Sequence, residues 1–292
     1  MMVCWYRTLW QALASRGKQT YNAHMEEYKP TKLPAGKVLV LLLCLVVIAA
    51  WWFETPTGLL AKADAVGYAV CHRIPARSFS VDGRPLPLCA RCSGMYLGAV
   101  AGIFFQVIVY PRRGGLPGWK ASIPFLLLGL AFAVDGTNSY LHLFPGLTGL
   151  YEPNNTLRLL TGAGMGITIA AYLVPSFHQT AWTVYDARPL FTSWRGYAGL
   201  LAAGFGAASL IFFDWSPLRY GLAWISAAGV ILILTLVYSV VYMMVFHRDN
   251  QAQGWRDMVI PLAVGLLTTV TQISLVDLAR YALTGTWGGF SL

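Results

Sequence analysis

Long, uninterrupted runs of apolar residues constrain this chain more than any other feature. A helix needs about 20 predominantly apolar residues to cross a hydrocarbon core about 30 Å thick, and the sequence supplies such runs repeatedly. Hydrophobic residues make up 57% of the 292 positions and charged residues only 11%, against roughly a quarter charged in an ordinary soluble domain. Too little polar surface is left to cover a soluble particle, so we expect an integral membrane protein.

In lipid, backbone N–H and C=O groups must pair within the protein, so the runs are predicted to be helices. The short alternating segments of a β-barrel are not seen. We predict an all-α, polytopic transmembrane helix bundle of about seven spans. A row of Gly94, Gly98 and Gly102 would let another helix approach closely. The predicted spans are 38–53, 93–110, 121–134 (extendable to Asn138), 157–174, 197–213, 222–246 and 258–283.

Lys and Arg residues near the spans set the orientation, because they are retained on the cytoplasmic side. A cytoplasmic N-terminus and an exoplasmic C-terminus place most of the 21 Lys and Arg residues inside. The exceptions concentrate in residues 62–92, which we predict to be an external loop. The exceptions within this loop are Lys62, Arg73, Arg77, Arg84 and Arg91, and the others are Arg158, Arg219 and Arg280. The expected protein is a multi-pass protein of the cell membrane, with residues 37–292 as its seven-span membrane domain.

Residues 1–36 precede the first span and are expected to form a basic cytoplasmic arm. Trp5, Leu9, Trp10 and Leu13 fall at helical spacing beside basic residues, which predicts a short helix on the inner leaflet. The net charge of +9 favours a bilayer with anionic headgroups as the partner on that side. A basic and aromatic nucleic-acid module is not visible, so nucleic acid is not expected to bind.

The predicted external loop also contains three of the five cysteines. Cys71-His72 and Cys89-x-x-Cys92 flank Asp82-Gly83, a pair typical of tight hairpin turns. The loop should therefore bring Cys71, His72, Cys89 and Cys92 together. Three thiols and one imidazole are an accepted ligand set for zinc. Because Cys71 and His72 are adjacent, they would share one metal ion only with an awkward backbone, and the fourth ligand could come from elsewhere.

Two other interpretations of the thiols stay open. On the exoplasmic side, Cys89 and Cys92 could form a disulfide or a redox-active pair. All three thiols could also be buried and unmodified. Covalent haem attachment is excluded, because Ser93 rather than His follows Cys92.

Ionisable residues inside the predicted spans form a second candidate site, because charges at membrane depth are costly. The simpler explanation is ion pairing, of Asp277 with Arg280 and of Asp135 with Arg158 or Arg91. The alternative is a polar cavity beneath the cysteine loop. The candidate cavity residues are Arg91, Asp135, Asn155, Arg158, Asp277 and Arg280.

Residues 71–79 (CHRIPARSF), 83–84 and 88–98 (LCARCSGMYLG) resemble a family of bacterial and archaeal predicted membrane proteins, domain of unknown function 2085. The resemblance continues at 135–136 and 155–162 and covers roughly residues 67–175. It implies no activity, so it supports the candidate site without supplying a function.

Three functions fit these observations, and whether the protein is an enzyme is left open. The first is a non-catalytic protein whose loop is folded by a metal, as a subunit or assembly partner of a membrane complex. The second is an enzyme that uses the metal, or Asp135 and Asp277, on a lipid-linked substrate. The third is a transporter, although no inverted repeat is evident. Four protein ligands would favour the structural role, and three with an open position the enzyme.

Overall fold

A computed structural model of the chain describes residues 35–144, 146, 148–189 and 194–288. The predicted interfacial helix in the N-terminal arm lies outside these residues. The chain divides into two units, Met1–Leu39 and Val40–Leu292. In the first unit, the structure describes only the first residues of one helix, from residue 35 onward. The arrangement of helices given below is that of the second unit.

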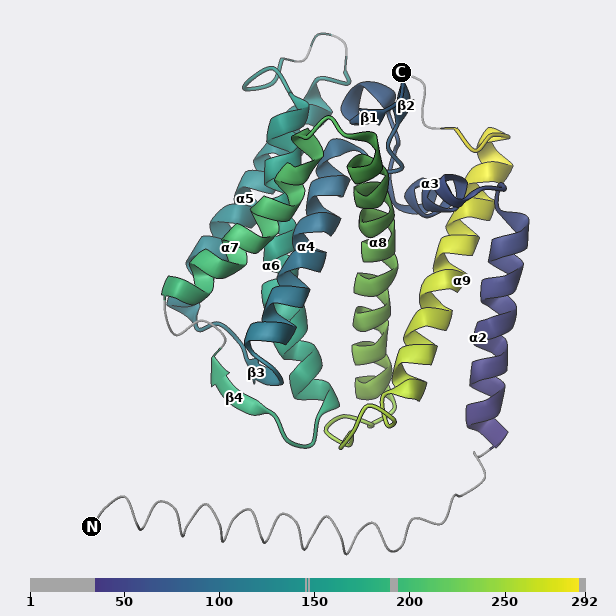
Figure 1. The fold of residues 1–292 in the computed structure, drawn as a ribbon, viewed down its shortest axis with the longest axis vertical. Helices are drawn as coiled ribbons and strands as arrows, with labels where there is room; N and C mark the ends of the chain where they lie inside the picture. Colours follow the sequence, from purple (N-terminus) through teal and green to yellow (C-terminus); the bar gives the residue numbers. More distant parts are fainter. Residues whose placement is uncertain (1–34, 145, 147, 190–193, 289–292) are drawn as a thin grey trace, which may run out of the picture. The chain divides into compact units, whose positions relative to one another are not determined.

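The described residues contain seven helices that are long and apolar enough to cross a membrane (Figure 1). Each overlaps one predicted span, so the predicted helical bundle is confirmed. A 3-10 turn, η2 (Leu210–Phe212), follows the fifth of them. In chain order the seven are α2 (Ala35–Glu54), α4 (Ala90–Val109), α5 (Trp119–Leu141), α6 (Asn155–Ala181), α7 (Trp194–Ser209), α8 (Ser216–Val245) and α9 (Val259–Thr284).

Two helices are longer than their apolar runs indicate. Helix α5 continues through Asp135 and Asn138, because both polar side chains find partners within the protein. The Oδ1 of Asn138 accepts a hydrogen bond from the N–H of Leu150 at 2.6 Å. Helix α6 continues past Pro175 to Ala181, since neighbouring helices in a membrane bundle accommodate the backbone group that a proline frees.

Helices α4 and α6 form the closest helix pair of the bundle. A Cβ atom added to Gly94 would overlap the carbonyl oxygen of Leu159, and one added to Gly162 would overlap that of Arg91. Gly98 meets the backbone of α6 in the same way at Ala163. The glycine row predicted to admit another helix therefore lies at this contact, where absent side chains let the backbones touch.

The segment between α2 and α4 is more ordered than the predicted loop. Its first part is a helix, α3 (Leu59–Val70), which packs against α8 and α9 (Figure 1). Ala63, Val66 and Tyr68 of this helix are buried, and this small apolar face explains why the loop boundary at residue 62 falls inside a helix. A 3-10 turn, η1 (Pro75–Arg77), follows.

A two-stranded hairpin then returns the chain to α4. Strands β1 (Ser80–Val81) and β2 (Arg84–Pro85) pair antiparallel, with Val81 opposite Arg84. Asp82 and Gly83 at the turn have φ of 49° and 76°, the left-handed conformation of a two-residue hairpin turn. The predicted Asp-Gly turn is confirmed. We use the name cysteine end for the region that contains α3, the hairpin and the adjoining ends of α4, α5, α6, α8 and α9. At the opposite end, β3 (Arg113–Gly115) pairs parallel with β4 (Asp186–Pro189).

Candidate functional site

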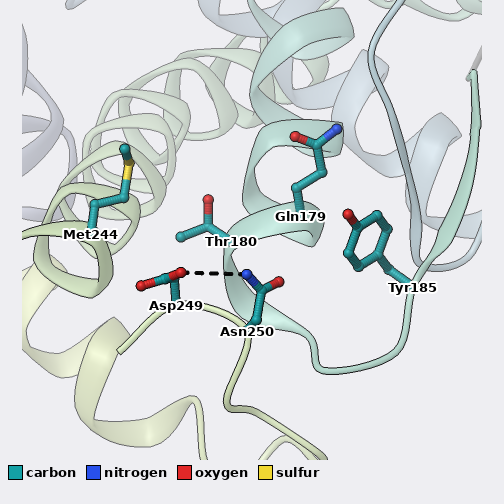
Figure 2. Close-up of a pocket in the computed structure, with 6 residues that line it drawn as sticks. All are labelled: Gln179, Thr180, Tyr185, Met244, Asp249 and Asn250. Atoms are coloured by element: carbon teal, nitrogen blue, oxygen red, sulfur yellow. Dashed lines mark hydrogen bonds between the residues drawn. The ribbon is translucent and has the colours of Figure 1, made fainter. Parts of the chain in front are cut away.

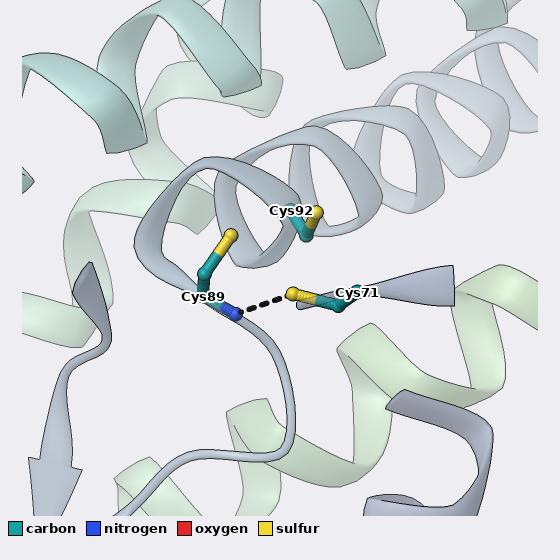
Figure 3. Close-up of side chains that lie close together, drawn as sticks. All are labelled: Cys71, Cys89 and Cys92. Atoms are coloured by element: carbon teal, nitrogen blue, oxygen red, sulfur yellow. Dashed lines mark hydrogen bonds between the residues drawn. The ribbon is translucent and has the colours of Figure 1, made fainter. Parts of the chain in front are cut away.

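Three thiols meet at the cysteine end (Figure 3). The Sγ atoms of Cys71, Cys89 and Cys92 all lie within 4.8 Å of one another. Cys71 is the C-terminal cap of α3 and Cys89 the N-terminal cap of α4, while Cys92 lies in the first turn of α4. All three are free thiols, as is Cys44 in α2. The tight turn at the hairpin thus brings the two halves of the cysteine motif together.

Backbone donors point at the sulfur of Cys71. The N–H of Cys89 lies 3.3 Å from this sulfur and the N–H of Arg73 lies 3.5 Å from it. Hydrogen bonds from the thiols of Cys71 and Cys92 lower the pKa of Cys89, whereas the contact with Cys89 raises the pKa of Cys71. The N-terminus of α4 also favours negative charge at Cys89. The cluster is therefore suited to hold negative charge on the sulfur of Cys89, and a thiolate is the form that binds a metal.

His72 lies apart from these thiols. It is exposed and does not belong to the group of close ligand atoms found among the described residues. The backbone at Cys71 is extended, with φ −137° and ψ 148°, and successive side chains of an extended backbone point in opposite directions. The structure thus brings together three of the four predicted ligands, and His72 is not part of the group.

Arg280 of α9 fixes the backbone that carries Cys71. Its Nη1 donates to the carbonyl oxygens of Tyr68 at 2.6 Å and Cys71 at 2.8 Å. Its guanidinium also lies 4.0 Å from the centre of the Tyr68 ring, a cation–π contact. Arg280, a candidate cavity residue from the sequence, therefore holds the end of α3 and the first thiol in place.

Other basic residues of this segment have local partners that the sequence did not reveal. Lys62 donates to the carbonyl oxygens of Trp52 and Thr55 at the end of α2. Asp64 forms ion pairs with Arg73, at 2.9 Å, and with Arg84. Burial raises the pKa of Asp64, and the two arginines oppose that rise. These contacts give the basic residues of this segment partners within the protein.

Asp135 of α5 is the centre of a second cluster at the same end. It is 1% exposed and forms an ion pair with Arg91 of α4. Its Oδ1 accepts a hydrogen bond from the hydroxyl of Tyr151 at 2.9 Å, and its Oδ2 one from the hydroxyl of Thr161 at 3.2 Å. Of the two ion-pair partners considered from the sequence, the structure selects Arg91.

Three arginines converge one helical turn further along α5, at Ser139. Arg77 lies 3.1 Å from its carbonyl oxygen, while Arg91 and Arg158 lie 2.8 Å and 3.4 Å from its hydroxyl. Arg158 also donates to Asn155 at 2.9 Å. Arg77 and Ser139 are new members of this cluster. Ser139 follows Asp135 by four residues and so shares its helix face, a signal that was present in the sequence.

Asp277 lies outside this arginine cluster. It is 3% exposed in α9, and its Oδ2 accepts a hydrogen bond from the indole of Trp51 at 3.3 Å. The six candidate cavity residues are thus divided between two places. Arg91, Asp135, Asn155 and Arg158 form one network, while Asp277 and Arg280 lie along α9.

A pocket of about 360 Å³ lies at the opposite end (Figure 2). In this pocket the side-chain amide of Asn250 donates a hydrogen bond to the carboxylate of Asp249 at 3.4 Å. Its lining comes from the end of α6, the end of α8 and the loops beyond them, and includes none of the candidate site residues. The residues that line it are Gln179, Thr180, Tyr185, Met244, Asp249 and Asn250.

Comparison with known proteins places the three clustered cysteines and the arginine cluster inside a shared region. Residues 71–172 match a family described as "Predicted membrane protein (DUF2085)". An uncharacterized protein of Methanocaldococcus jannaschii is 38% identical over 119 residues, which are 39% of this chain and 68% of that protein. An uncharacterized protein of Methanothermobacter thermautotrophicus is 36% identical over 101 residues, 35% of this chain and 81% of that protein. No solved structure matches.

Proposed function

The chain belongs to the DUF2085 family of predicted membrane proteins, and we propose that its function depends on a metal site formed by Cys71, Cys89 and Cys92. Zinc is the expected ion. The site has a structural role and fastens the segment between α3 and α4 onto the helix bundle. The protein acts as a subunit or assembly partner of a larger membrane complex.

The close approach of the three sulfurs carries this proposal. Zn–S bonds of about 2.3 Å in a tetrahedral site set neighbouring sulfurs about 3.8 Å apart. The sulfurs here lie within 4.8 Å of one another, so small side-chain movements suffice. The neighbouring thiols and the N-terminus of α4 stabilise a thiolate at Cys89. A thiolate is the form that zinc requires.

A structural role fits the local architecture. The residues between Cys71 and Cys89 contain one 3-10 turn and two strands of two residues each, too little to form a core of their own. A metal held by both ends of this segment would supply folding free energy directly. The ion would also join α3 to α4, since Cys71 caps the one and Cys89 the other.

Elemental analysis of detergent-purified protein tests the metal site. We expect about one zinc per chain in the native protein, and a loss of most of it in Cys71→Ser, Cys89→Ser and Cys92→Ser. Cys44→Ser is the matched control, because Cys44 is a buried thiol in α2 outside the cluster, and it should keep its metal. A native protein without stoichiometric metal would overturn the proposal and favour a disulfide or a redox-active thiol pair.

A membrane enzyme is the second candidate, and the position of His72 favours it. Three protein ligands would leave the fourth position for water or substrate, as in catalytic zinc sites. X-ray absorption separates the two functions by the ligands that it counts. Three sulfurs and one nitrogen, with the nitrogen lost in His72→Ala, would support the structural site. Three sulfurs and an oxygen that exchanges with added anions would support the enzyme.

The proposal also includes an orientation, with the N-terminus cytoplasmic and the cysteine end exoplasmic. The distribution of basic residues supports it, since the cytoplasmic loops would then contain Arg112, Arg113, Lys120, Arg248 and Arg256. Alkaline phosphatase fused to the C-terminus should then be active. A green fluorescent protein fused at the same position should not fluoresce. The reverse result would reject this orientation. Anionic lipids on the cytoplasmic side remain the proposed lipid partner.

A further inference from the structure

Three guanidinium groups gather at one point where α4 and α6 begin and α5 ends. Each of them contacts Ser139, which is 1% exposed. We propose that Arg77, Arg91 and Arg158 form a binding site for the phosphate group of an anionic ligand. This site lies beside the thiol cluster but goes beyond the metal role, and it does not depend on it.

The balance of charge is the first argument. In the described part of the chain, Asp135 is the one carboxylate that forms an ion pair with any of the three arginines. Asn155, which accepts a hydrogen bond from Arg158, is neutral. Three positive charges therefore face one carboxylate in this network. The negative charge on Cys89 also acts on Arg77 and Arg158, which still leaves one positive charge unbalanced, and Arg158 is only 6% exposed. Unbalanced charge away from water is unfavourable, and a bound anion would balance it.

The helix termini add to the positive potential. Arg91 and Arg158 lie in the first turns of α4 and α6, which have 20 and 27 residues. Acidic side chains are the favoured residues there, because the N-terminus of a helix carries partial positive charge. Neither first turn contains one. Both helices instead present a cation at their positive ends, which is favourable when an anion lies between them.

The contact of α4 with α6 holds these two first turns together. Gly162 meets the carbonyl of Arg91, and Gly94 meets that of Leu159. The glycines that let the helices approach are thus within one turn of the two arginines. The backbone contact fixes the distance between the positions from which the two arginine side chains extend, and hydrogen bonds to Ser139 hold their guanidinium groups together.

Phosphate fits this set of donors better than a single carboxylate does. Guanidinium groups bind phosphate oxygens through paired, nearly parallel N–H bonds, and three of them surround a group with several acceptor oxygens. The side chain of Arg91 is 19% exposed, so the cluster is reachable from outside. It lies at the ends of the membrane helices, where lipid headgroups lie. A lipid headgroup and free phosphate offer the same chemistry, and experiment can separate them.

Thermal unfolding of the purified full-length protein in phosphate-free detergent tests the site. Inorganic phosphate is titrated in one series and short-chain phosphatidylglycerol in another, with zwitterionic phosphatidylcholine as the reference lipid. Arg158→Gln removes the buried arginine and Arg77→Gln a half-buried one outside the membrane helices. The charge-matched control is Arg256→Gln, at an exposed position of the opposite end. All retain the three cysteines, so their metal content reports independently on folding and on the metal proposal.

We expect phosphate or phosphatidylglycerol to raise the unfolding temperature of the native protein and of Arg256→Gln. Both site variants should bind at least about tenfold more weakly, because each loses a charged hydrogen-bonding group. A response to inorganic phosphate alone identifies free phosphate as the ligand, and a response to phosphatidylglycerol alone identifies a lipid. The site is disproved if neither probe stabilises the native protein. It is equally disproved if Arg77→Gln, with native metal content, binds as tightly as the control.

Discussion

The Nη1 of Arg280 lies 2.8 Å from the carbonyl oxygen of Cys71. Arg280 belongs to α9, far beyond residues 71–172 that match the family. The last helix of the chain therefore positions the first thiol of a cluster whose other two thiols come from α4. A contact of this kind does not supply a ligand, but it determines where a ligand lies.

Arg280→Gln should weaken metal binding without removing a ligand. Residues that orient the ligands of a metal typically contribute about 10–100-fold in affinity, and we expect the lower part of that range. Competition with a chromogenic zinc chelator measures the change. Arg280→Lys, which keeps the charge but loses the forked geometry, should fall between. Equal affinities for Arg280→Gln and the native protein would show that the α9 contact has no influence on the cluster.

Gly94→Ala should destabilise the bundle. The added methyl group would overlap the carbonyl oxygen of Leu159, and overpacking of this kind costs about 1–3 kcal/mol. Gly129→Ala in α5 is the control, because an added Cβ there meets nothing within 4 Å. The unfolding temperature in detergent should fall for Gly94→Ala and stay level or rise slightly for Gly129→Ala. Similar values for both would mean that α4 and α6 separate at little cost.

The helix bundle could be predicted from the sequence because it follows from apolar run length, which is a local property. The proximity of the three thiols could be predicted for the same reason, since the turn at Asp82-Gly83 lies midway between Cys71 and the pair Cys89 and Cys92. The family resemblance was also correct, as the comparisons confirm. Each of these inferences uses residues that are close in the chain.

Contacts between distant helices could not be predicted in this way. The pairing of Asp277 with Trp51 and of Arg280 with the end of α3 depends on how α9 packs, and periodicity does not reveal that. Helix α3 was missed because its twelve residues are too few to give a membrane-span signal. Arg77 was counted only as a charge, because its partner Ser139 lies on another helix.

Asp135→Asn should have two effects of opposite sign. Removing one partner of a buried ion pair costs about 3–5 kcal/mol, and Tyr151 and Thr161 would lose a charged acceptor, so the ligand-free protein should unfold at lower temperature. At the arginine cluster, however, the loss of a negative charge should strengthen phosphate binding. Thermal unfolding with and without inorganic phosphate measures both. The control is Asp214→Asn, whose carboxylate is 90% exposed in its pair with Arg219 and should matter little.

Weaker phosphate binding by Asp135→Asn would count against the charge argument. It would mean that Asp135 organises the arginines, through Arg91, more than it competes with an anion for them. A purely structural cluster predicts lower stability alone, with no phosphate dependence in any variant. The sign of the phosphate effect therefore separates the two interpretations.

Removal of the metal should expose the segment between α3 and α4 to protease. Without an ion to join Cys71 to Cys89, this segment has little structure of its own, and trypsin cleaves the open form. We expect a chelator to accelerate cleavage after Arg73 and Arg77 in the native protein and in Cys44→Ser.

Cleavage after Arg248 and Arg256, exposed at the opposite end, should not change and serves as the control within the same digest. Cys89→Ser should be cleaved rapidly with or without chelator. Elemental analysis must show that the chelator has removed the metal. If the rates of cleavage after Arg73 and Arg77 are then unchanged, the ion does not hold this segment. A catalytic metal with an open coordination position would then explain the cluster better.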